Sequence, residues 1–429
     1  MNNIYRGEKI SKQDFVDKLD MMKSQIEKDL LRNPLMPEKV IEAANTLSKE
    51  MKEVEVVDKI IELGISKWAV EEYVRVAIDS LSKDALLKKV HTELRENPFT
   101  WRKVVEGIEE KEHPLGVIVH IGAGNALGLS AFSVIEGLLT GNINILKLPE
   151  NEGGLSSMLL MRLIEIEPLL KPYIYVLDVS SKDKEVICQL IGIANAVVVW
   201  GSDETIKAIR QLTPPRLPLI EWGHRLSFAY FTNNESIGKN LAGLARNICI
   251  SDQLYCSSPQ CVFYETDDRR EVDHFANQLA QHMESIAGQY LVQDRPLEIQ
   301  AQITWIQELI KMEELLQLKR LITDENNTFG VMVDYNPGLK ASPLFRNIWV
   351  MPIKRENLFK LLRAHKGHLQ TVGLCCEEQE FEELSKIFYT AGIHRITSCE
   401  AMSKNYSGEP HDGVYSLRNY VRIVNKVSI

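Results

Sequence analysis

The stretch LGVIVHIGAGNALG (115–128) decides the fold of this chain. Its first seven residues form an apolar run without Asp, Glu, Lys or Arg, a glycine-rich turn follows, and residues 126–140 have helical spacing. A strand that is apolar throughout is buried on both faces, as in a parallel sheet covered by helices. The stretch therefore predicts the first strand, turn and helix of an α/β domain.

The same alternation of apolar runs and helical segments continues to residue 222. Further strands are expected at 142–148, 173–178, 195–200 and 218–222, and helices at 152–168, 182–192 and 203–211. Ligands of such sheets bind beyond the carboxyl ends of the strands. The loops that follow these strands are therefore the first places to look for chemistry.

A second series of the same kind begins after residue 227. Strands are expected at 228–231, 260–265, 329–335, 347–353 and 371–376, and helices at 269–287, 299–321 and 378–391. The tail, 418–429, is expected to be a final strand that returns to the first domain or pairs with a neighbouring subunit. The predicted domains are an N-terminal helical region (1–110), a first α/β domain on which it packs (111–225), a second α/β domain (226–398) and a C-terminal return or oligomerisation segment (399–429).

The N-terminal region has helical spacing. Apolar residues recur every three or four positions behind Ser11, a suitable helix cap with Asp14 three residues later. Pro37 is expected to open a second helix that runs to about Glu50, because proline is favoured at the first helical position. These helices are expected to pack on the rest of the chain and to take part in assembly.

Composition limits the classes of partner. The 429 residues include 50 Lys and Arg against 59 Asp and Glu, a net charge of −9, which disfavours nucleic acid and anionic membranes. The segment 114–135 has no charged residue but holds four glycines, His120 and Asn125, so we interpret it as buried structure rather than a membrane span. Seven cysteines without CxxC spacing, together with a start that lacks an apolar signal segment, predict a cytoplasmic protein with no metal site.

Candidate ligand-binding residues follow the strands of the first series. The turn 121–128 has a glycine pattern one residue too long for a dinucleotide fingerprint, but its Asn125 amide would stabilise an oxyanion, or would cap the next helix. Lys147 and Glu150 would hydrogen-bond ribose hydroxyls, or would form a solvent-facing pair. Gly201 and Ser202 would open a helix whose N-terminus receives a pyrophosphate, or would form an ordinary turn.

Two further residues are candidates for the chemical step. Glu221 ends a strand among apolar neighbours, where burial would suit it to proton transfer; the structural alternative is a pair with Arg225. Cys256 lies in the polar loop SDQLYCSSPQC, where a partly exposed thiolate would act as a nucleophile; the alternative is a core cysteine. Cys249 and Cys261 fall on apolar runs and are expected in the core.

Taken together, these loops resemble the aldehyde dehydrogenase superfamily, and more specifically the acyl-CoA (fatty-acyl) reductases associated with bacterial bioluminescence. The most specific element is D-Q-x-x-C-S-x-P-Q (252–260), because these reductases place the glutamine three residues before the cysteine, whereas general aldehyde dehydrogenases place it two before. The stretches 115–125 and 137–148 strengthen the resemblance, which runs from about His113 to Val424.

The resemblance implies a role for each candidate residue. Cys256 takes the position of the acyl-accepting nucleophile and Asn125 that of the oxyanion-hole asparagine; Lys147 and Glu150 match the adenosine-ribose contacts, and Gly201 with Ser202 the pyrophosphate turn. Glu221 takes the position of the general base, although Trp222 and His224 depart from the superfamily's E-L-G-G pattern. The second ribose-binding glutamate has no counterpart in FRNIWVMP (345–352), so the contacts of the nicotinamide-side ribose stay unassigned.

The resemblance implies the superfamily fold of two α/β domains with an N-terminal helical region and a small oligomerisation element. It makes residues 111–225 the nicotinamide-cofactor-binding domain and residues 226–398 the catalytic domain that carries the cysteine. The implied function is reduction of an acyl-CoA to the aldehyde through a cysteine thioester, with Glu221 or His224 as proton donor. The alternatives are an aldehyde dehydrogenase that forms a carboxylic acid and an inactive scaffold. Family members use NADPH, whereas the charge of Glu150 predicts tolerance of NADH. Expected partners are an acyl-CoA, further copies of the chain and an acyl-activating synthetase; the acyl chain length stays open.

Overall fold

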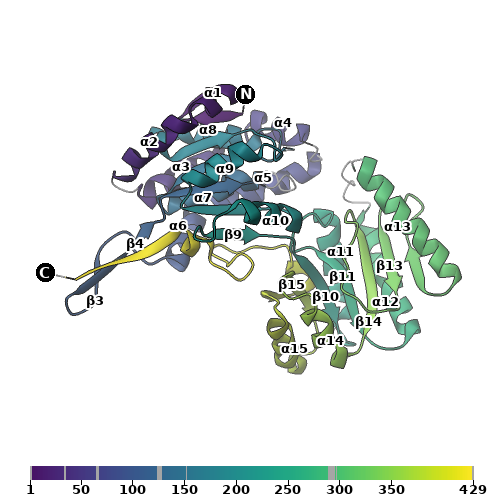
Figure 1. Cartoon of the computed structure of the whole chain (residues 1–429). Coiled ribbons are helices and arrows are strands. Elements are labelled where there is room, and N and C mark those ends of the chain that lie inside the picture. The colour runs from purple at the N-terminus through teal and green to yellow at the C-terminus, as the bar shows by residue number, and fades with distance from the viewer. Residues whose placement is uncertain are drawn as a thin grey trace. The chain divides into compact units, whose positions relative to one another are not determined.

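Figure 1 shows a computed structural model of the chain, which describes residues 2–32, 35–63, 67–122, 128–150, 152–287, 295 and 297–427. The chain divides into two compact units. The first unit comprises residues 1–63, 70–223 and 406–429, and the second comprises residues 64–69 and 224–405. The first unit therefore contains the end of the chain as well as its beginning.

The first unit is built on a seven-stranded sheet in the order β2-β1-β7-β6-β5-β8-β9. The strands β5 to β9 are parallel, and the short β1 and β2 are antiparallel additions at one edge. The bounds are β1 Asn3–Tyr5, β2 Glu8–Ile10, β5 Val117–Ile121, β6 Ile143–Lys147, β7 Ile174–Leu177, β8 Ala196–Trp200 and β9 Leu219–Trp222. The order reverses at β5, which has β6 on one side and β8 on the other, and ligands bind at such a reversal.

Helices cover both faces of this sheet. On one face Val117, Val119, Ile145, Val197 and Val199 pack against α1, α2, α9 and α10, and on the other face α7 contacts β5 and β6 and is backed by α3 and α8. The bounds are α1 Lys12–Asp17, α2 Leu19–Leu30, α3 Pro37–Glu50, α4 Val54–Glu62, α5 Lys67–Leu81, α6 Lys83–Glu93, α7 Leu129–Leu139, α8 Leu155–Ile166, α9 Lys184–Ile193 and α10 Asp203–Leu212.

The predicted N-terminal caps are present, although the single helix expected behind Ser11 is divided at Lys18 into α1 and α2. The Ser11 hydroxyl accepts a hydrogen bond from the Asp14 N–H at 3.0 Å, and the helix that Pro37 opens ends at Glu50. The strands β1 and β2 were not predicted. They have three residues each, which is too few for a period-two pattern to be recognised.

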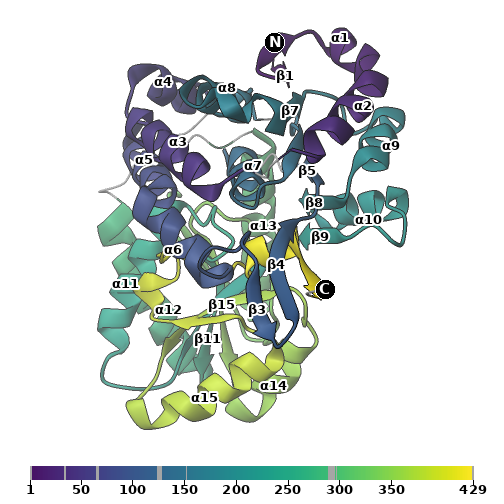
Figure 2. The same ribbon diagram turned by 90° about the vertical axis from the view of Figure 1, so that its left-hand side faces the viewer.

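A three-stranded antiparallel sheet belongs to the first unit (Figure 2). It consists of β3 Arg102–Val105, β4 Ile108–Pro114 and β17 Val421–Val427, with β4 in the centre. The predicted tail strand is β17, and it pairs with β4 from Val421↔Pro114 to Val427↔Ile108. The 3-10 helix η3, Ser416–Tyr420, leads into it.

The second unit is a second seven-stranded sheet, in the order β12-β13-β14-β11-β10-β15-β16. All pairs are parallel except β12 with β13. The strands are β10 Leu226–Phe231, β11 Pro259–Glu265, β12 Lys319–Ile322, β13 Gly330–Asp334, β14 Asn347–Ile353, β15 Leu369–Cys375 and β16 Arg395–Thr397. The helices are α11 Ile237–Ser251, α12 Arg269–Ala287, α13 Leu297–Leu315, α14 Arg355–Arg363 and α15 Glu378–Ala391.

Sequence periodicity predicted most of these elements but misjudged one helix. The helix expected at 299–321 ends at Leu315, because Gln317 adopts a left-handed conformation (φ 57°) and Lys319–Ile322 pairs with β13 as an edge strand. α14 and β16 were not predicted. In the described part of the chain, no helix is long and apolar enough to cross a bilayer, and the uncharged segment 114–135 contains β5 and most of α7.

Candidate active site

Cys256 lies in the loop 252–258, between the end of α11 and the start of β11, and its side chain is exposed. The two cysteines on either side of the loop, Cys249 and Cys261, are fully buried. Burial raises the pKa of both thiols to about 12, so they stay protonated at neutral pH. The prediction that these two are core residues is confirmed, and Cys256 is the exposed thiol of this segment.

The cysteine loop is fastened to the neighbouring strands at their amino ends. The Ser227 hydroxyl, in β10, donates to the Cys256 carbonyl at 2.8 Å, and the Thr371 N–H, in β15, donates to the Ser227 oxygen at 3.2 Å. Strands β10 and β15 are parallel to β11, so these contacts lie along one edge of the second sheet. The backbone of Cys256 is therefore held by the sheet and not only by its own loop.

The polar residues of the D-Q-x-x-C-S-x-P-Q motif are buried supports of this loop. Asp252 pairs with Arg346 (Nε to Oδ1, 2.5 Å). The Gln253 amide donates to the Pro259 carbonyl at 2.7 Å, which closes the loop on itself, and the Gln260 side chain accepts from the Ser342 N–H at 3.1 Å. The motif that carries the resemblance thus fixes the shape of the segment around the exposed thiol.

Lys147 and Glu150 lie at the carboxyl end of β6, at the reversal of the first sheet. Lys147 is 4% exposed, and burial lowers the pKa of its ammonium although Glu150 and Asp178 raise it. The Ser181 N–H and the hydroxyls of Ser180 and Ser181 donate to Glu150 Oε1 at 2.9–3.0 Å. These bonds, the backbone one first, lower the pKa of Glu150 to about 2. A buried cation and a fixed anion therefore stand at this edge.

Gly201 and Ser202 follow β8 at the same edge. The Ser202 hydroxyl caps α10 by accepting from the Thr205 N–H at 3.4 Å, and the Gly201 N–H donates to the Trp222 carbonyl at 3.2 Å. A Cβ on Gly201 would lie 3.1 Å from the Thr205 side chain, so the turn is too tight for a larger residue without adjustment. The predicted strand–turn–helix geometry is present, with the N–H groups at the start of α10 beside the turn.

Glu221 is the penultimate residue of β9, the outermost strand on this side of the sheet, and its carboxylate is paired. Arg210 of α10 donates through Nε to Oε1 at 3.0 Å and through Nη2 to Oε2. The glutamate is paired, as the structural alternative expected, but its partner stands eleven residues before it in the chain rather than in the following loop. Proton transfer by Glu221 requires this bidentate pair to open.

Asn125 lies outside the described residues. Its flanks are described: the Gly122 N–H donates to the Lys147 carbonyl at 3.1 Å, and the Gly128 N–H donates to Glu152 at 3.3 Å. Glu152 is 1% exposed, and burial raises the pKa of its carboxyl group. Sequence reasoning missed Glu152, because a carboxylate in a glycine-containing loop gives no sign that it will be buried.

An aromatic cluster at the carboxyl ends of β8 and β9 was also missed. Trp200 and Trp222 stack with ring centroids 5.4 Å apart, and the His411 ring lies 4.9 Å from Trp222. The Trp200 indole N–H donates to the Ser133 hydroxyl at 3.1 Å. The two tryptophans stand beside Gly201 and Glu221 in the sequence, but nothing in the pattern predicts that His411, nearly two hundred residues away, joins them.

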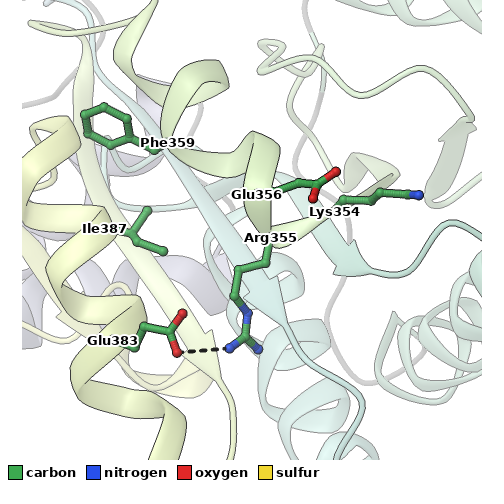
Figure 3. A pocket seen from close by; sticks show the side chains of 6 residues that line it. All are labelled: Lys354, Arg355, Glu356, Phe359, Glu383 and Ile387. Carbon is green, nitrogen blue, oxygen red and sulfur yellow. Dashed lines mark hydrogen bonds and ion pairs between the residues drawn. The ribbon is translucent and has the colours of Figure 1, made fainter.

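Figure 3 shows a hollow in the second unit that is lined by Arg355, Phe359 and Glu383, among others. Its lining follows the carboxyl ends of the strands, whereas Cys256 precedes the amino end of β11. The hollow lies between α14 and α15, which follow the carboxyl ends of β14 and β15. Arg355 in this hollow donates to Glu265, Glu380 and Glu383, and Lys354 pairs with Asp267. The cations are neutralised by carboxylates, so the hollow gives no reason to place anionic substrates there.

Comparison with known proteins gives a match over most of the chain. A family model described as "Acyl-CoA reductase (LuxC)" matches residues 33–423. The long-chain acyl-protein thioester reductase of Aliivibrio fischeri is 24% identical over 319 residues, which are 73% of this chain and 64% of the relative. The long-chain acyl-protein thioester reductase 2 of Photobacterium leiognathi is 24% identical over 352 residues, 81% of this chain and 71% of the relative. The chain thus spans about two thirds of the length of these curated relatives.

Solved structures show the same fold. An NAD-dependent benzaldehyde dehydrogenase from Corynebacterium glutamicum aligns with a TM-score of 0.73 over 100% of this chain and 95% of its own, at 14% identity. The predicted aldehyde-dehydrogenase-like α/β fold is confirmed.

Proposed function

The chain belongs to the acyl-CoA reductase family, and we propose on that premise that it reduces a fatty acyl thioester to the aldehyde, with Cys256 as nucleophile and a nicotinamide cofactor as reductant. The observation that carries the proposal is the exposed thiol of Cys256 on a loop whose backbone is fixed by buried polar residues. Nucleophilic catalysis needs an accessible thiolate in a preorganised position.

The first half of the reaction transfers the acyl group to the enzyme. The Cys256 thiolate attacks the thioester carbonyl, and the N–H of Cys256 together with the Asn125 amide would stabilise the oxyanion. Collapse of this adduct releases the donor thiol and leaves an acyl-cysteine. The hydrogen bond from Ser227 to the Cys256 carbonyl supports this role. It fixes the backbone of Cys256, and the N–H of the same residue must point at the oxyanion.

The residues at the carboxyl edge of the first sheet suit a nicotinamide dinucleotide. The Glu150 carboxylate would accept from ribose hydroxyls, the Lys147 ammonium would donate to them, and the Gly201–Ser202 turn with the start of α10 would receive the pyrophosphate. When bound, a reduced nicotinamide supplies the hydride that brings the acyl group to the aldehyde level. The ionised Glu150 would repel a 2′-phosphate, so we propose that NADH is accepted.

Release of the aldehyde requires a proton for the departing Cys256 sulfur. Glu221 and His224 are the two candidates by sequence. Both oxygens of Glu221 are engaged by Arg210, whereas His224 is exposed. We therefore assign proton donation to His224. The pairing of Glu221 also argues against the alternative activity, aldehyde oxidation to a carboxylic acid, because that reaction needs a general base to activate water.

The acyl donor is the finer part of the proposal. The family is named for acyl-CoA reductases, whereas the curated relatives are named for acyl-protein thioesters. We propose a long-chain acyl-CoA as the donor that the isolated chain accepts. An acyl group carried on a partner synthetase is the competing donor, and kcat/KM measured with each as substrate separates them.

The proposed nucleophile is tested by acyl-enzyme formation. Purified enzyme is incubated with radiolabelled palmitoyl-CoA without reductant, and the label bound to protein is counted after gel filtration. Cys256→Ala should abolish the label, whereas Cys188→Ala, which removes an exposed cysteine of α9 in the first unit, should retain it. Full labelling of Cys256→Ala would reject the assignment.

A further inference from the structure

An unusual backbone segment precedes β14. Leu344, Phe345 and Arg346 are consecutive left-handed residues, with φ of 62°, 49° and 67°. Residues with a Cβ adopt this conformation at a cost, and three in succession persist only where the surroundings enforce them. The side-chain amide of Asn347 donates to the carbonyls of Leu344 and Phe345 at 2.9 and 3.1 Å. The residue that follows the segment therefore also stabilises its conformation.

The segment 344–346 holds the start of the cysteine loop. Arg346 pairs with Asp252 (Nε to Oδ1, 2.5 Å), and the Phe345 N–H donates to the Asp252 carbonyl at 2.9 Å. Asp252 and Gln253 are themselves left-handed, with φ of 46° and 62°. Two strained turns, ninety-four residues apart in sequence, therefore fix each other.

An apolar pair of similar volume could fill the space that the ion pair between these turns occupies. The side chains of Arg346 and Asp252 are both 0% exposed. Burying two charges costs desolvation that their attraction barely repays, and a well-packed apolar pair of similar volume is often as stable. What an apolar pair does not supply is direction, because a charge-assisted hydrogen bond sets both distance and angle.

We propose that Arg346 and the left-handed segment 344–346 are positioning elements for the nucleophile. By locking Asp252 they set the path of residues 252–258, and thereby the orientation of the Cys256 thiol and N–H toward the thioester carbonyl. This inference rests on the proposed role of Cys256 but goes beyond it. A small displacement of a reacting group lowers the rate of the chemical step more than it weakens substrate binding.

The test replaces the ion pair by an apolar pair, Asp252→Leu with Arg346→Met, so that neither member of the pair is left buried without the other. We expect kcat to fall by about a hundredfold while KM stays within about threefold. The rate of Cys256 alkylation by iodoacetamide should change relative to that of Cys188 in the same molecule, read by peptide mass spectrometry. The control is Glu265→Leu with Arg355→Met, which removes the ion pairs of Arg355 with Glu265, Glu380 and Glu383 at the opposite edge of the same sheet and should leave both readouts unchanged.

The possible outcomes distinguish failure of the positioning role of Arg346 from failure of the proposed role of Cys256 as nucleophile. If the apolar double variant folds and keeps its kcat, the positioning role is wrong although Cys256 remains the nucleophile. If the Cys256→Ala enzyme is itself fully labelled, the proposed function fails, and the alkylation ratio still reports the shape of the loop. Should the double variant not fold, Arg346→Lys keeps the buried positive charge but removes the Nε bond to Asp252, and an unchanged kcat and alkylation ratio would then refute the proposal.

Discussion

The proposed cofactor preference depends on a single side chain, that of Glu150. Three hydrogen bonds to Oε1 hold its carboxylate in place and lower its pKa to about 2, so the group is charged throughout the physiological range. In the part of the chain that the structure describes, these hydrogen bonds all go to Oε1, so Oε2 would be available to a bound ribose. A fixed anion is the simplest means of discriminating against a 2′-phosphate.

Replacing Glu150 by Gln should therefore shift selectivity toward NADPH. We expect the ratio of kcat/KM for NADPH to that for NADH to rise about tenfold, the effect of removing about 1.4 kcal/mol of repulsion. Glu165→Gln, a charge removal on the exposed end of α8, serves as the control. A ratio that does not move would show that Glu150 has no contact with the adenosine ribose.

At the residue scale the sequence predicted positions well and partners poorly. Lys147 and Gly201 lie where strands end, and Cys256 lies in the loop that precedes a strand, as expected, because apolar runs locate the strands. The partners came from remote parts of the chain: Arg346 lies ninety-four residues from Asp252, and His411 packs on Trp222. Such pairings follow from tertiary packing, which no local periodicity encodes.

Among the elements, α10 carries a cap whose loss can be measured in two ways. Ser202→Ala removes the hydroxyl that accepts from the Thr205 N–H and should cost about 1 kcal/mol of stability. Because the start of α10 is also the proposed pyrophosphate site, KM for the nicotinamide should rise about threefold or more. Ser11→Ala removes an equivalent cap from α1 and should lower stability alone. Equal KM values for the two variants would contradict the pyrophosphate assignment.

Strand β5 contributes a buried histidine, His120, to the core of the first unit. We expect this histidine to make the unit less stable in acid. His120 is fully buried, where its ring nitrogens contact the Ser133 hydroxyl and the Asn144 carbonyl oxygen, and burial lowers its pKa to about 4. The unfolded chain binds a proton near pH 6.5 and the folded chain does not, so stability present above pH 6.5 is lost as the pH falls toward 4.

The expected slope from His120 is about 1 kcal/mol per pH unit between pH 6.5 and 4. Urea unfolding of the wild type and of His120→Gln over this range measures it, since Gln keeps hydrogen-bonding groups without a proton to bind. A variant with the same pH slope as the wild type would show that other groups govern acid sensitivity.

The error in α13 shows the limit of periodicity at the scale of elements. Helical spacing continues beyond Leu315 into Leu318 and Leu321, so the pattern alone extends the helix to residue 321. The left-handed Gln317 ends it, and residues 319–322 gain backbone hydrogen bonds at the edge of the second sheet. Pairing with β13 outweighs local helical preference, a choice that depends on a strand formed later in the chain.

On the scale of the whole molecule, the chain leaves the first unit at residue 223 and re-enters it at residue 406. The returning segment is tightly integrated: the Leu417 N–H donates to Glu93 at 2.7 Å, and the Asn142 amide donates to the Tyr420 carbonyl at 2.9 Å. β17 then completes the three-stranded sheet with β4. The first unit therefore cannot finish folding until the whole second unit has been synthesised.

This architecture predicts that replacing two equally buried leucines by alanine will lower different melting transitions. Leu417 and Leu384 are both 0% exposed, one in the returning segment of the first unit and the other in α15 of the second. Each change to Ala should cost about 2–5 kcal/mol. Leu417→Ala should lower the melting transition that NADH raises, because ligand stabilises only the unit that binds it, and Leu384→Ala should lower the other. Calorimetry with and without NADH resolves the two, and if both variants lower both transitions equally, the units unfold as a single cooperative structure.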